Sequence, residues 1–433
     1  MIESSRRTGV PRVVVSGIGL RTALGPDAES TWSGIRSGRS GASALPAGCL
    51  PGRPWFGFPI PGPGIRAMPP GVAEAVAAAE DALLFDRGEP TFDPERAAAA
   101  IGLSKGHLGL LARWCDRIDR PRDFPQAETN PDWTEAWPDA AARAATRSLG
   151  LRGPSLGPIA ACATGVVAVL RAAELIRRGD CDLAIAGATD ASLDPLVLGA
   201  FDRMRVLARV GGDPKEAVRP WDRRRSGFLV GEGGAVLVLE REEHARARGV
   251  LPYAEVAGGA LGSDAGHETN LDPDPRRLAA LIVEAIRRGG IDPNEVDLVN
   301  VHGTATLVND PLECRAIRLA LGSAADAVSC SANKPQIGHL LGGAGAAELA
   351  IACLSLRDQF APPTLNLTDP DPACDLDGTP GIGRPRTIRV ALKLSLGFGG
   401  HLAAAVLRLP DGPRRSGPSQ DGRDRDREEV RGV

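Results

Sequence analysis

The sequence predicts an α/β protein in which strands covered by helices are arranged in two similar blocks. Short apolar, β-branched segments recur along the chain, and segments with helical spacing of apolar residues follow them. Strands that alternate with helices form βαβ units with parallel strands. The blocks at about residues 10–250 and 251–409 contain similar elements. This favours a duplicated fold, although no strong residue-level repeat relates the two blocks.

The first block opens with a buried strand over 13–20 (VVVSGIGL), which ends in glycines. A helix is expected over 27–37. Residues 45–70 are crowded with Pro and Gly, which is typical of irregular surface structure. The alanine-rich segment 73–84 predicts a second helix, and 97–103 resembles another buried strand.

The middle of the chain is more regular. Residues 115–140 hold Trp, Pro and Asp, which predicts a long loop. Apolar residues between 166 and 176 have the spacing of one helix face. Strands are expected at 182–187 and 235–239, the latter followed by a charged helix or turn.

The second block begins after Pro252 with a further strand. Its other expected elements are a helix at 276–289, strands at 296–301 and 327–331, a helix at 344–357 and a last strand at 403–407. From Pro410 the chain alternates charge with Gly, Pro and Ser, which predicts a disordered tail. The expected domains are therefore an N-terminal half (1–250), a C-terminal half (251–409) and a tail (410–433).

Composition excludes several classes of protein. Of 433 residues, 43 % are hydrophobic and 24 % charged, as in ordinary soluble proteins, and the net charge of −3 argues against a nucleic-acid partner. No apolar run reaches about 18 residues and no signal peptide is recognisable, so no integral membrane association is expected. None of the eight cysteines forms a C-x-x-C pair. We therefore expect a cytoplasmic protein with reduced thiols.

Lysine is almost absent. The chain has 51 Lys plus Arg, and only Lys105, Lys215, Lys334 and Lys393 are lysines. Genomic codon bias accounts for this ratio. A retained lysine is nevertheless of interest, because Arg cannot replace a compact ammonium whose pKa the protein can adjust.

Cys162 lies in the segment AACATG (160–165), immediately before the amphipathic helix. The partial positive charge of a helix N-terminus stabilises a thiolate, so a lowered pKa is expected for this thiol. Backbone N–H groups at the same junction are suited to hold an oxyanion. The alternative is a buried core cysteine between alanines.

Two histidines follow predicted strands. His302 ends the strand at 296–301, and His339 lies in SANKPQIGH, with Lys334 five residues before it and Glu348 on the next helix. Ligands gather at the carboxyl ends of parallel strands. Each histidine alone is equally consistent with capping a turn. One Cys and two His at such positions, however, form a nucleophile with two imidazoles.

These residues resemble the β-ketoacyl-(acyl carrier protein) synthases, the condensing enzymes of fatty acid and polyketide synthesis. The similarity covers some 400 residues in the family's order. Its motifs are VVVSGIGL, GRSG (38–41), LRGPS (151–155), the Cys162 segment, RPWDRRRSGFLVGEGG (219–234), HGTAT (302–306), Asp310 and Glu313, NKPQIGHLLGGAGAAE (333–348) and LGFGG (396–400).

The resemblance implies a thiolase-like five-layer αβαβα fold and a homodimer. It assigns Cys162 as the nucleophile that takes the acyl group, and His302 and His339 as hydrogen-bond donors to the malonyl thioester oxygen while CO2 leaves. Lys334 and Glu348 match the family's supporting ion pair.

The resemblance also assigns residues around this centre. The backbone N–H groups of Cys162 and Phe398 form the oxyanion hole. The remaining matches are Thr304 and Thr306 for the phosphopantetheine arm, Phe228, Phe398, Gly399, Gly400 and Asp264 for gating of the acyl channel, and Arg203 and Arg205 for docking of the carrier protein.

One departure from the family pattern concerns gating. Leu402 replaces an Asn near the GFGG loop, and it cannot donate the hydrogen bond that Asn would give Asp264. An unpaired carboxylate near an acyl pocket is costly unless solvent or His401 compensates. We therefore expect altered gating and acyl specificity.

The resemblance predicts an elongating ketosynthase, similar to β-ketoacyl-(acyl carrier protein) synthase II, rather than an initiating one. It would condense an acyl thioester with malonyl-(acyl carrier protein) by decarboxylation, with no cofactor and no metal. Acyl carrier protein is the expected partner. The alternative is a non-catalytic subunit, similar to a chain-length factor, in a ketosynthase heterodimer. A thiolase is disfavoured because thiolases use a different Cys/His/Cys arrangement.

Overall fold

The computed structural model describes residues 10–46, 54–61, 71–83, 92–118 and 133–412. Within them one large sheet has the strand order β10-β9-β13-β14-β8-β1-β7-β6-β4-β5. Its strands are β1 (Val13–Arg21), β4 (Ala97–Gly102), β5 (Ser155–Leu156), β6 (Leu183–Asp190), β7 (Gly233–Arg241), β8 (Ala254–Ser263), β9 (Leu298–Asn300), β10 (Ser329–Ser331), β13 (Val390–Gly397) and β14 (His401–Arg408). Two small hairpin-like pairs are β2 (Ser43–Ala44) with β3 (Phe56–Gly57), and β11 (Phe360–Ala361) with β12 (Arg384–Pro385).

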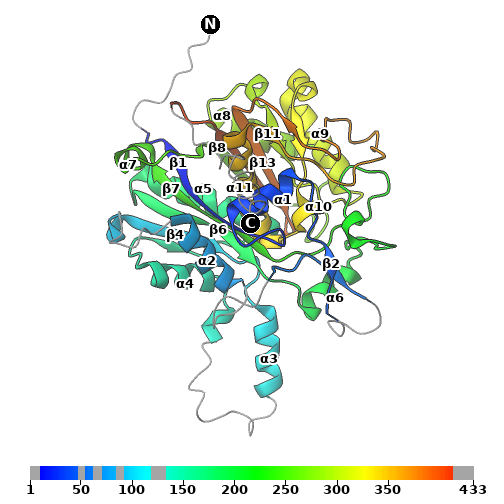
Figure 1. Ribbon diagram of the computed structural model, residues 1–433, viewed down its shortest axis with the longest axis horizontal. Helices are drawn as coiled ribbons and strands as arrows, with labels where there is room; N and C mark the ends of the chain where they lie inside the picture. The colour runs from blue at the N-terminus through cyan, green and yellow to red at the C-terminus, as the bar shows by residue number, and fades with distance from the viewer. Residues whose placement is uncertain (1–9, 47–53, 62–70, 84–91, 119–132, 413–433) are drawn as a thin grey trace, which may run out of the picture.

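Eleven α-helices occur in the described residues (Figure 1). They are α1 (Ala28–Arg36), α2 (Val72–Leu83), α3 (Leu108–Ile118), α4 (Ala140–Leu149), α5 (Thr164–Arg178), α6 (Pro195–Arg203), α7 (Glu242–Ala247), α8 (Arg276–Arg288), α9 (Asn309–Leu321), α10 (Lys334–Ile337) and α11 (Ala344–Asp358). None of these helices is long and apolar enough to cross a bilayer.

The sheet has the same strand pattern twice. In the order β1-β7-β6-β4-β5, the first two pairs are antiparallel and the last two parallel. The order β8-β14-β13-β9-β10 repeats this pattern. The duplicated fold is thus visible in the topology, while the domain boundary at residue 250 stays a prediction. The expected parallel pairs are present, but half of the pairs in each repeat are antiparallel, because a strand that returns through a tight turn, as β14 does after β13, must run antiparallel.

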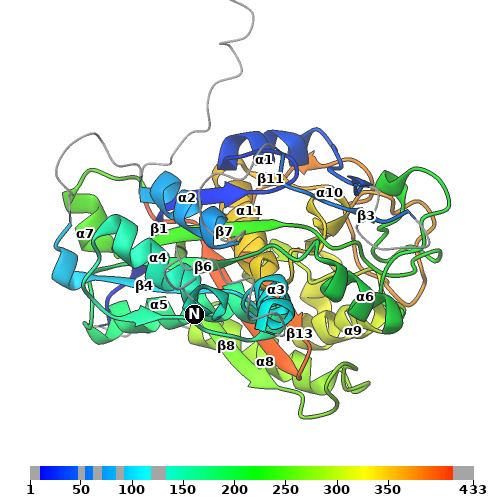
Figure 2. The same ribbon diagram turned by 90° about the horizontal axis from the view of Figure 1, so that it is seen from below.

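The helices form three layers around the two half-sheets. Figure 1 shows α2 and α4 below the first half-sheet, α5 and α11 between the two, and α8 and α9 above the second. Successive strand residues face opposite layers. Ala184 and Ala186 of β6 pack with α5 and α11, whereas Leu183 and Ile185 pack with α2 and α4. Figure 2 shows α1 and α10 on the opposite side of the molecule from α8 and α9.

The two central helices, α5 and α11, have the same structure at their N-termini. A short 3-10 turn (Ala161–Ala163) precedes α5, and another (Leu341–Gly343) precedes α11; both helices have 15 residues. Ala161 and Leu341 have φ of +46° and +48°, a region that non-glycine residues rarely adopt. The second turn therefore repeats the first.

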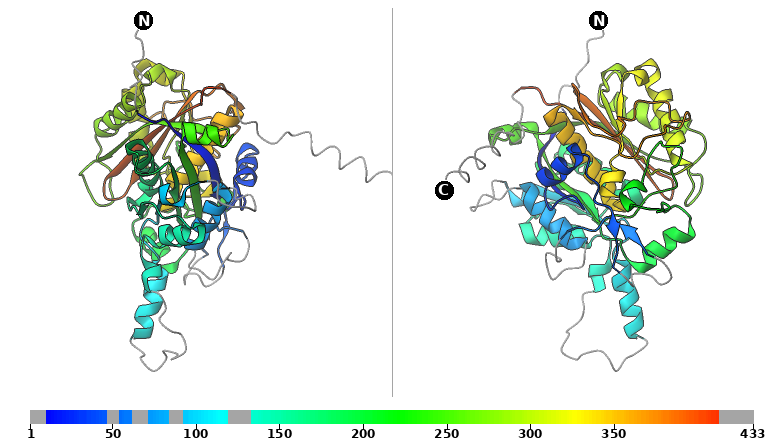
Figure 3. Two further views of the ribbon diagram at one scale, coloured as in Figure 1. Left: turned by 90° about the vertical axis from the view of Figure 1, so that its left-hand side faces the viewer. Right: turned by 45° about the vertical axis from the view of Figure 1, so that its right-hand side comes forward.

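Some expected elements differ from the structure. The predicted bounds of the loop at 115–140 are wrong, because α3 continues to Ile118 and α4 starts at Ala140. Figure 3 shows α3 extending away from the body of the molecule. Helices α6 and α9 and strand β13 were not expected. The tail beyond residue 412 and parts of 45–70 lie outside the described residues.

Candidate active site

Cys162 lies in the 3-10 turn before α5 and is 8 % exposed. The end of β13 approaches this turn very closely. A β-carbon at Gly397 would stand 2.6 Å from the carbonyl oxygen of Ala160. Glycine at this position therefore allows the next residue, Phe398, to present its backbone N–H to the Cys162 thiol, to which it hydrogen-bonds.

The resting thiol is protonated. Burial raises the pKa of Cys162 to about 11, and the charges of Lys334 and Lys105 oppose this rise only in part. The expectation of a lowered pKa is therefore wrong. The helix terminus is present as expected, but removal from water has the larger effect.

The two histidines lie beside this thiol. Donor atoms of Cys162, His302 and His339 are all within 4.8 Å of one another, and all three residues are buried. The imidazole centroids are 5.4 Å apart, and the rings are nearly perpendicular. The sequence prediction that these three side chains meet is therefore realised in the fold. By donor type alone, such a group also suits a zinc ion.

Both imidazoles are neutral. Burial lowers the pKa of His302 and of His339 well below the usual value, and the charge of Lys334 lowers both further. The Leu341 N–H donates to Nδ1 of His339 at 3.3 Å, which leaves the proton on Nε2. His339 therefore presents a neutral N–H donor.

Charged side chains fix the backbone at His302. The N–H groups of His302 and Gly303 donate to the two oxygens of Glu313 at 2.6 and 2.9 Å. Lys334 donates to the His302 carbonyl and pairs with Glu348 at 2.8 Å. Burial raises the pKa of Glu313 to about 7. The expected pair of Lys334 and Glu348 is thus present and directly supports His302.

Sequence reasoning missed Lys393 at this site. Its Nζ lies 2.6 Å from Glu348 Oε2, and both side chains are buried. Lys393 stands within β13, a strand that was not expected. The available signal was a single lysine inside the apolar segment VALKLSLG.

Aromatic rings border the centre. Phe228 packs edge-on against His339, with centroids 4.8 Å apart. The ring of Phe201 contacts those of Phe228 and Phe398, with centroid distances of 5.6 and 6.3 Å. Phe201 therefore lies between Phe228 and Phe398, the two aromatic residues predicted from the sequence. Phe201 itself was not predicted. Its place on α6, a helix missed from the sequence, explains the omission.

The loop that follows Phe398 is built for a tight turn. Gly399 and Gly400 have φ of +81° and +77°, which glycine adopts without strain. A β-carbon at Gly400 would stand 2.3 Å from Asp264 Oδ1. Gly399 donates to the Glu268 carbonyl at 2.7 Å, so this turn packs against the loop that carries Asp264.

Asp264 does not lack partners. Its carboxylate accepts the N–H groups of Gly266 and Asp272 at 3.1 and 3.2 Å. Leu402 instead pairs with Gly262 between β14 and β8 and packs in an apolar cluster. The expectation of an unpaired carboxylate is therefore wrong, and this removes the reason for expecting altered gating.

Thr304 and Thr306 flank a strained turn. Their hydroxyls are 3.1 Å apart, and Ala305 between them has a φ of +58°. Arg225 donates to the Thr306 carbonyl at 3.1 Å, and Gly227 donates to the Ala305 carbonyl at 2.8 Å. The turn is thus held from the segment 219–228.

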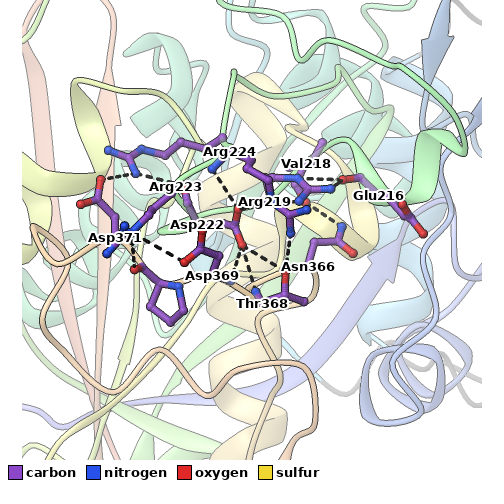
Figure 4. A network of polar contacts seen from close by, with 12 residues as sticks. Glu216, Val218, Arg219, Asp222, Arg223, Arg224, Asn366, Thr368, Asp369 and Asp371 are labelled. Atoms are coloured by element: carbon purple, nitrogen blue, oxygen red, sulfur yellow. Dashed lines mark hydrogen bonds and ion pairs between the residues drawn. The ribbon is translucent and has the colours of Figure 1, made fainter.

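That segment is anchored by Asp222 (Figure 4). Its buried carboxylate accepts the N–H groups of Arg224, Thr368 and Asp369 at 2.8–2.9 Å. Burial opposes ionisation, but these backbone donors lower the pKa of Asp222 to about 2. This network joins the 219–225 segment to the loop at 366–371.

Arg203 and Arg205 are exposed at the end of α6. Arg205 borders a cleft of about 620 Å³, which Trp55, Leu229 and Leu307 also line. Arg205 has a φ of +58°. The expected docking arginines therefore stand at the surface beside an opening, whereas the Pro-rich segment 62–70 lies outside the described residues.

The chain is similar to known proteins over most of its length. The family model "Beta-ketoacyl synthase, N-terminal domain" matches residues 58–245, and "Beta-ketoacyl synthase, C-terminal domain" matches 253–368. The 3-oxoacyl-(acyl-carrier-protein) synthase 2 of Coxiella burnetii is 33 % identical over 92 % of this chain and 98 % of that protein. The corresponding synthase 2 of Mycobacterium tuberculosis is 36 % identical over 91 % of this chain and 96 % of that protein.

The chain belongs to the β-ketoacyl synthase family.

Solved structures agree with this assignment. A type II polyketide ketosynthase, in complex with its acyl carrier protein and bound to a hexaketide, aligns with a TM-score of 0.86 and 32 % identity. The alignment covers 93 % of this chain and all of that one. A β-ketoacyl synthase from Burkholderia phymatum aligns with a TM-score of 0.83 and 29 % identity. The predicted thiolase-like α/β fold is confirmed.

The family also determines the class of reaction. The chain is an acyltransferase of the ketosynthase type, which carries out the condensation of fatty acid or polyketide synthesis. The enzyme class predicted from the sequence is confirmed.

Proposed function

We propose that Cys162 is the acyl-carrying nucleophile and that His302 and His339 stabilise the enolate formed from malonyl-(acyl carrier protein). One observation carries this proposal: the thiol and two neutral imidazoles lie within 4.8 Å of one another in a buried centre. No metal and no cofactor are required.

In the first half-reaction the Cys162 sulfur attacks the acyl thioester. The new sulfur–carbon bond forms, the carrier's sulfur–carbon bond breaks, and the thiol proton goes to the departing pantetheine sulfur. The N–H groups of Cys162 and Phe398 would hold the oxyanion. The hydrogen bond from Phe398 to the thiol supports this assignment.

In the second half-reaction the malonyl carbon–carbon bond breaks and CO2 leaves. The electron pair forms an enolate, whose oxygen accepts N–H hydrogen bonds from His302 and His339. A neutral donor suits this charge, because it stabilises the oxygen where charge develops. The enolate carbon then attacks the acyl-Cys162 carbonyl, and the released thiolate takes a proton from solvent.

We propose acyl carrier protein as the partner. A similar ketosynthase supports this proposal, because its structure was solved in complex with its acyl carrier protein. The exposed Arg203 and Arg205 suit an acidic partner, and Thr304 and Thr306 would hold the phosphopantetheine arm. Gly399, Gly400 and Asp264 form the proposed gating loop together with Phe228 and Phe398.

We further propose a cytoplasmic homodimer. Strand β5 is an exposed sheet edge next to Ile159, which is 52 % exposed, and such edges are available for pairing. The seven cysteines of the described residues are free, as in a reducing compartment. A heterodimer is the alternative, because one similar solved ketosynthase, 29 % identical to this chain, is paired with a chain length factor.

Intact-protein mass spectrometry tests the proposal. Wild type and Cys162→Ala are incubated with acyl-carrier-protein thioesters of several chain lengths. Acyl mass on wild type alone supports the nucleophile. No acylation of folded wild type by any donor overturns it and favours the non-catalytic subunit. Light scattering of the purified chain distinguishes a homodimer from a monomer that needs a partner.

A further inference from the structure

Three of the four lysines surround the reaction centre. Lys334 begins α10, Lys393 stands in β13 and Lys105 follows β4. The charges of all three act on His339. In a chain that otherwise uses arginine, this clustering indicates that a compact ammonium is required there. The roles described above use Lys334 but give Lys393 none.

Lys393 connects the elements that carry the reactive residues. Its buried ammonium lies 2.6 Å from Glu348 Oε2 on α11 and donates to the Val301 carbonyl at 3.3 Å. Val301 directly precedes His302, and β13 itself leads to Phe398. Lys393 therefore contacts the support of the histidine and lies on the strand that presents the oxyanion donor.

The two lysines act on consecutive carbonyls. Lys393 donates to Val301, and Lys334 donates to His302. Glu348 lies between the two ammoniums, with one oxygen toward each. The peptide that holds His302 is thus fixed by two cations which share a single carboxylate.

The charges of this group do not cancel. Near neutral pH, two ammoniums and one carboxylate leave one net positive charge beside the imidazoles. Burial lowers the pKa of Lys393 to about 8, so this excess charge is lost as the pH rises through that value. A positive charge nearby disfavours protonation of an imidazole. Removal of Lys393 would leave a neutral pair of Lys334 and Glu348, and the field at the histidines would weaken.

We propose that Lys393 is a positioning residue for decarboxylation: it holds the His302 loop through Val301 and adds a buried positive charge that disfavours protonation of both imidazoles. The proposal rests on the role proposed above for His302 and His339.

Other groups also face the histidines and must be separated from Lys393. They are Lys334 on α10, Glu348 on α11, Glu313 on α9, Lys105 after β4, Cys162 before α5 and the opposite imidazole. Glu313 is the most important of these, because burial places its pKa at about 7. The pH dependence of the rate alone could not separate the titration of Glu313 from that of the histidines. The histidines are therefore observed directly.

The test compares wild type with Lys393→Met and, as a matched control, Lys215→Met. Lys215 is the fourth lysine and is exposed. CO2 release from malonyl-(acyl carrier protein) is measured against pH. In parallel, 13Cε1-labelled histidine is titrated by NMR, with His302 and His339 assigned by substitution among the six histidines.

In K393M the titration midpoints of His302 and His339 are expected to rise by at least about one pH unit, because one charge even about 10 Å away at an effective dielectric constant of about 20 shifts a pKa by roughly that much. The plateau rate of CO2 release falls as well. K215M leaves both readouts at wild-type values. Because Lys334 still pairs with Glu348, K393M leaves no unpaired buried charge. Lys393→Arg serves as a second variant that keeps the charge.

A double variant separates charge from position. Lys393→Met with Glu348→Gln restores one net positive charge, so the histidine midpoints return toward wild type. The plateau rate stays low, because the contact with Val301 remains lost. Unchanged midpoints in K393M overturn the electrostatic part, and an unchanged plateau overturns the positioning part. A wild type that neither acylates Cys162 nor releases CO2 would instead refute the proposed function.

Discussion

Gly397 lies directly against Cys162, so that a β-carbon on Gly397 would stand 3.2 Å from the Cys162 nitrogen. The close approach brings the Phe398 N–H to the thiol. The geometry of the proposed oxyanion hole thus depends on Gly397 having no side-chain carbon.

Gly397→Ala is expected to impair acylation more than folding. The added carbon would also meet the Ala160 carbonyl at 2.6 Å, so the two segments must separate and the hole must widen. Loss of one oxyanion donor costs on the order of 100-fold in rate. Single-turnover acylation of Cys162 checks this, with circular dichroism to confirm the fold. Acylation at the wild-type rate would show that Phe398 is not a donor.

Alkylation of Cys162 should increase with pH well beyond neutrality. A pKa raised by burial to about 11 means that the thiolate fraction rises about tenfold per unit between pH 7 and 10. Iodoacetamide labelling followed by peptide mass spectrometry measures the rate, with the exposed Cys115 as an internal reference. A rate at Cys162 that is constant above pH 7 would contradict a protonated resting thiol.

Leu402→Asn is expected to lower stability without changing acyl preference. Asp264 already accepts two backbone N–H groups, whereas Leu402 is 5 % exposed in an apolar cluster. Burying an amide there costs about 1–3 kcal/mol. Urea unfolding measures the loss, and competition between carrier-protein thioesters of different length measures preference. A changed preference would return Leu402 to the gating mechanism.

Charge reversal of Arg203 and Arg205 to Glu should weaken the use of carrier-protein substrates. Exposed charges at an interface mainly affect association rate and salt dependence. We expect kcat/KM for malonyl-(acyl carrier protein) to fall about tenfold at low salt, with a smaller change for malonyl-CoA. Equal losses for both substrates would indicate a defect in the active site instead of docking.

The sequence predicted the residues of the reaction centre, but it did not predict their neighbours or the effect of burial on their pKa values. The sequence motifs reveal all three reactive residues: Cys162 lies in the turn before α5, His302 follows β9 and His339 follows α10, and the fold brings them together. Lys393 was missed because its strand was not recognised. The pKa of Cys162 was misjudged because local helix geometry is visible in sequence, whereas burial by distant segments is not. The partners of Asp264 are backbone groups, which carry no sequence signal.

The repeated turn before α11 has a further consequence. Gly342 occupies in the second repeat the place that Cys162 occupies in the first, while the histidines come only from the second repeat. The proposed nucleophile thus lies in one repeat and the proposed hydrogen-bond donors lie in the other. Neither repeat alone carries a complete reaction centre, so turnover by a ketosynthase of this design reports that both repeats have folded and met correctly.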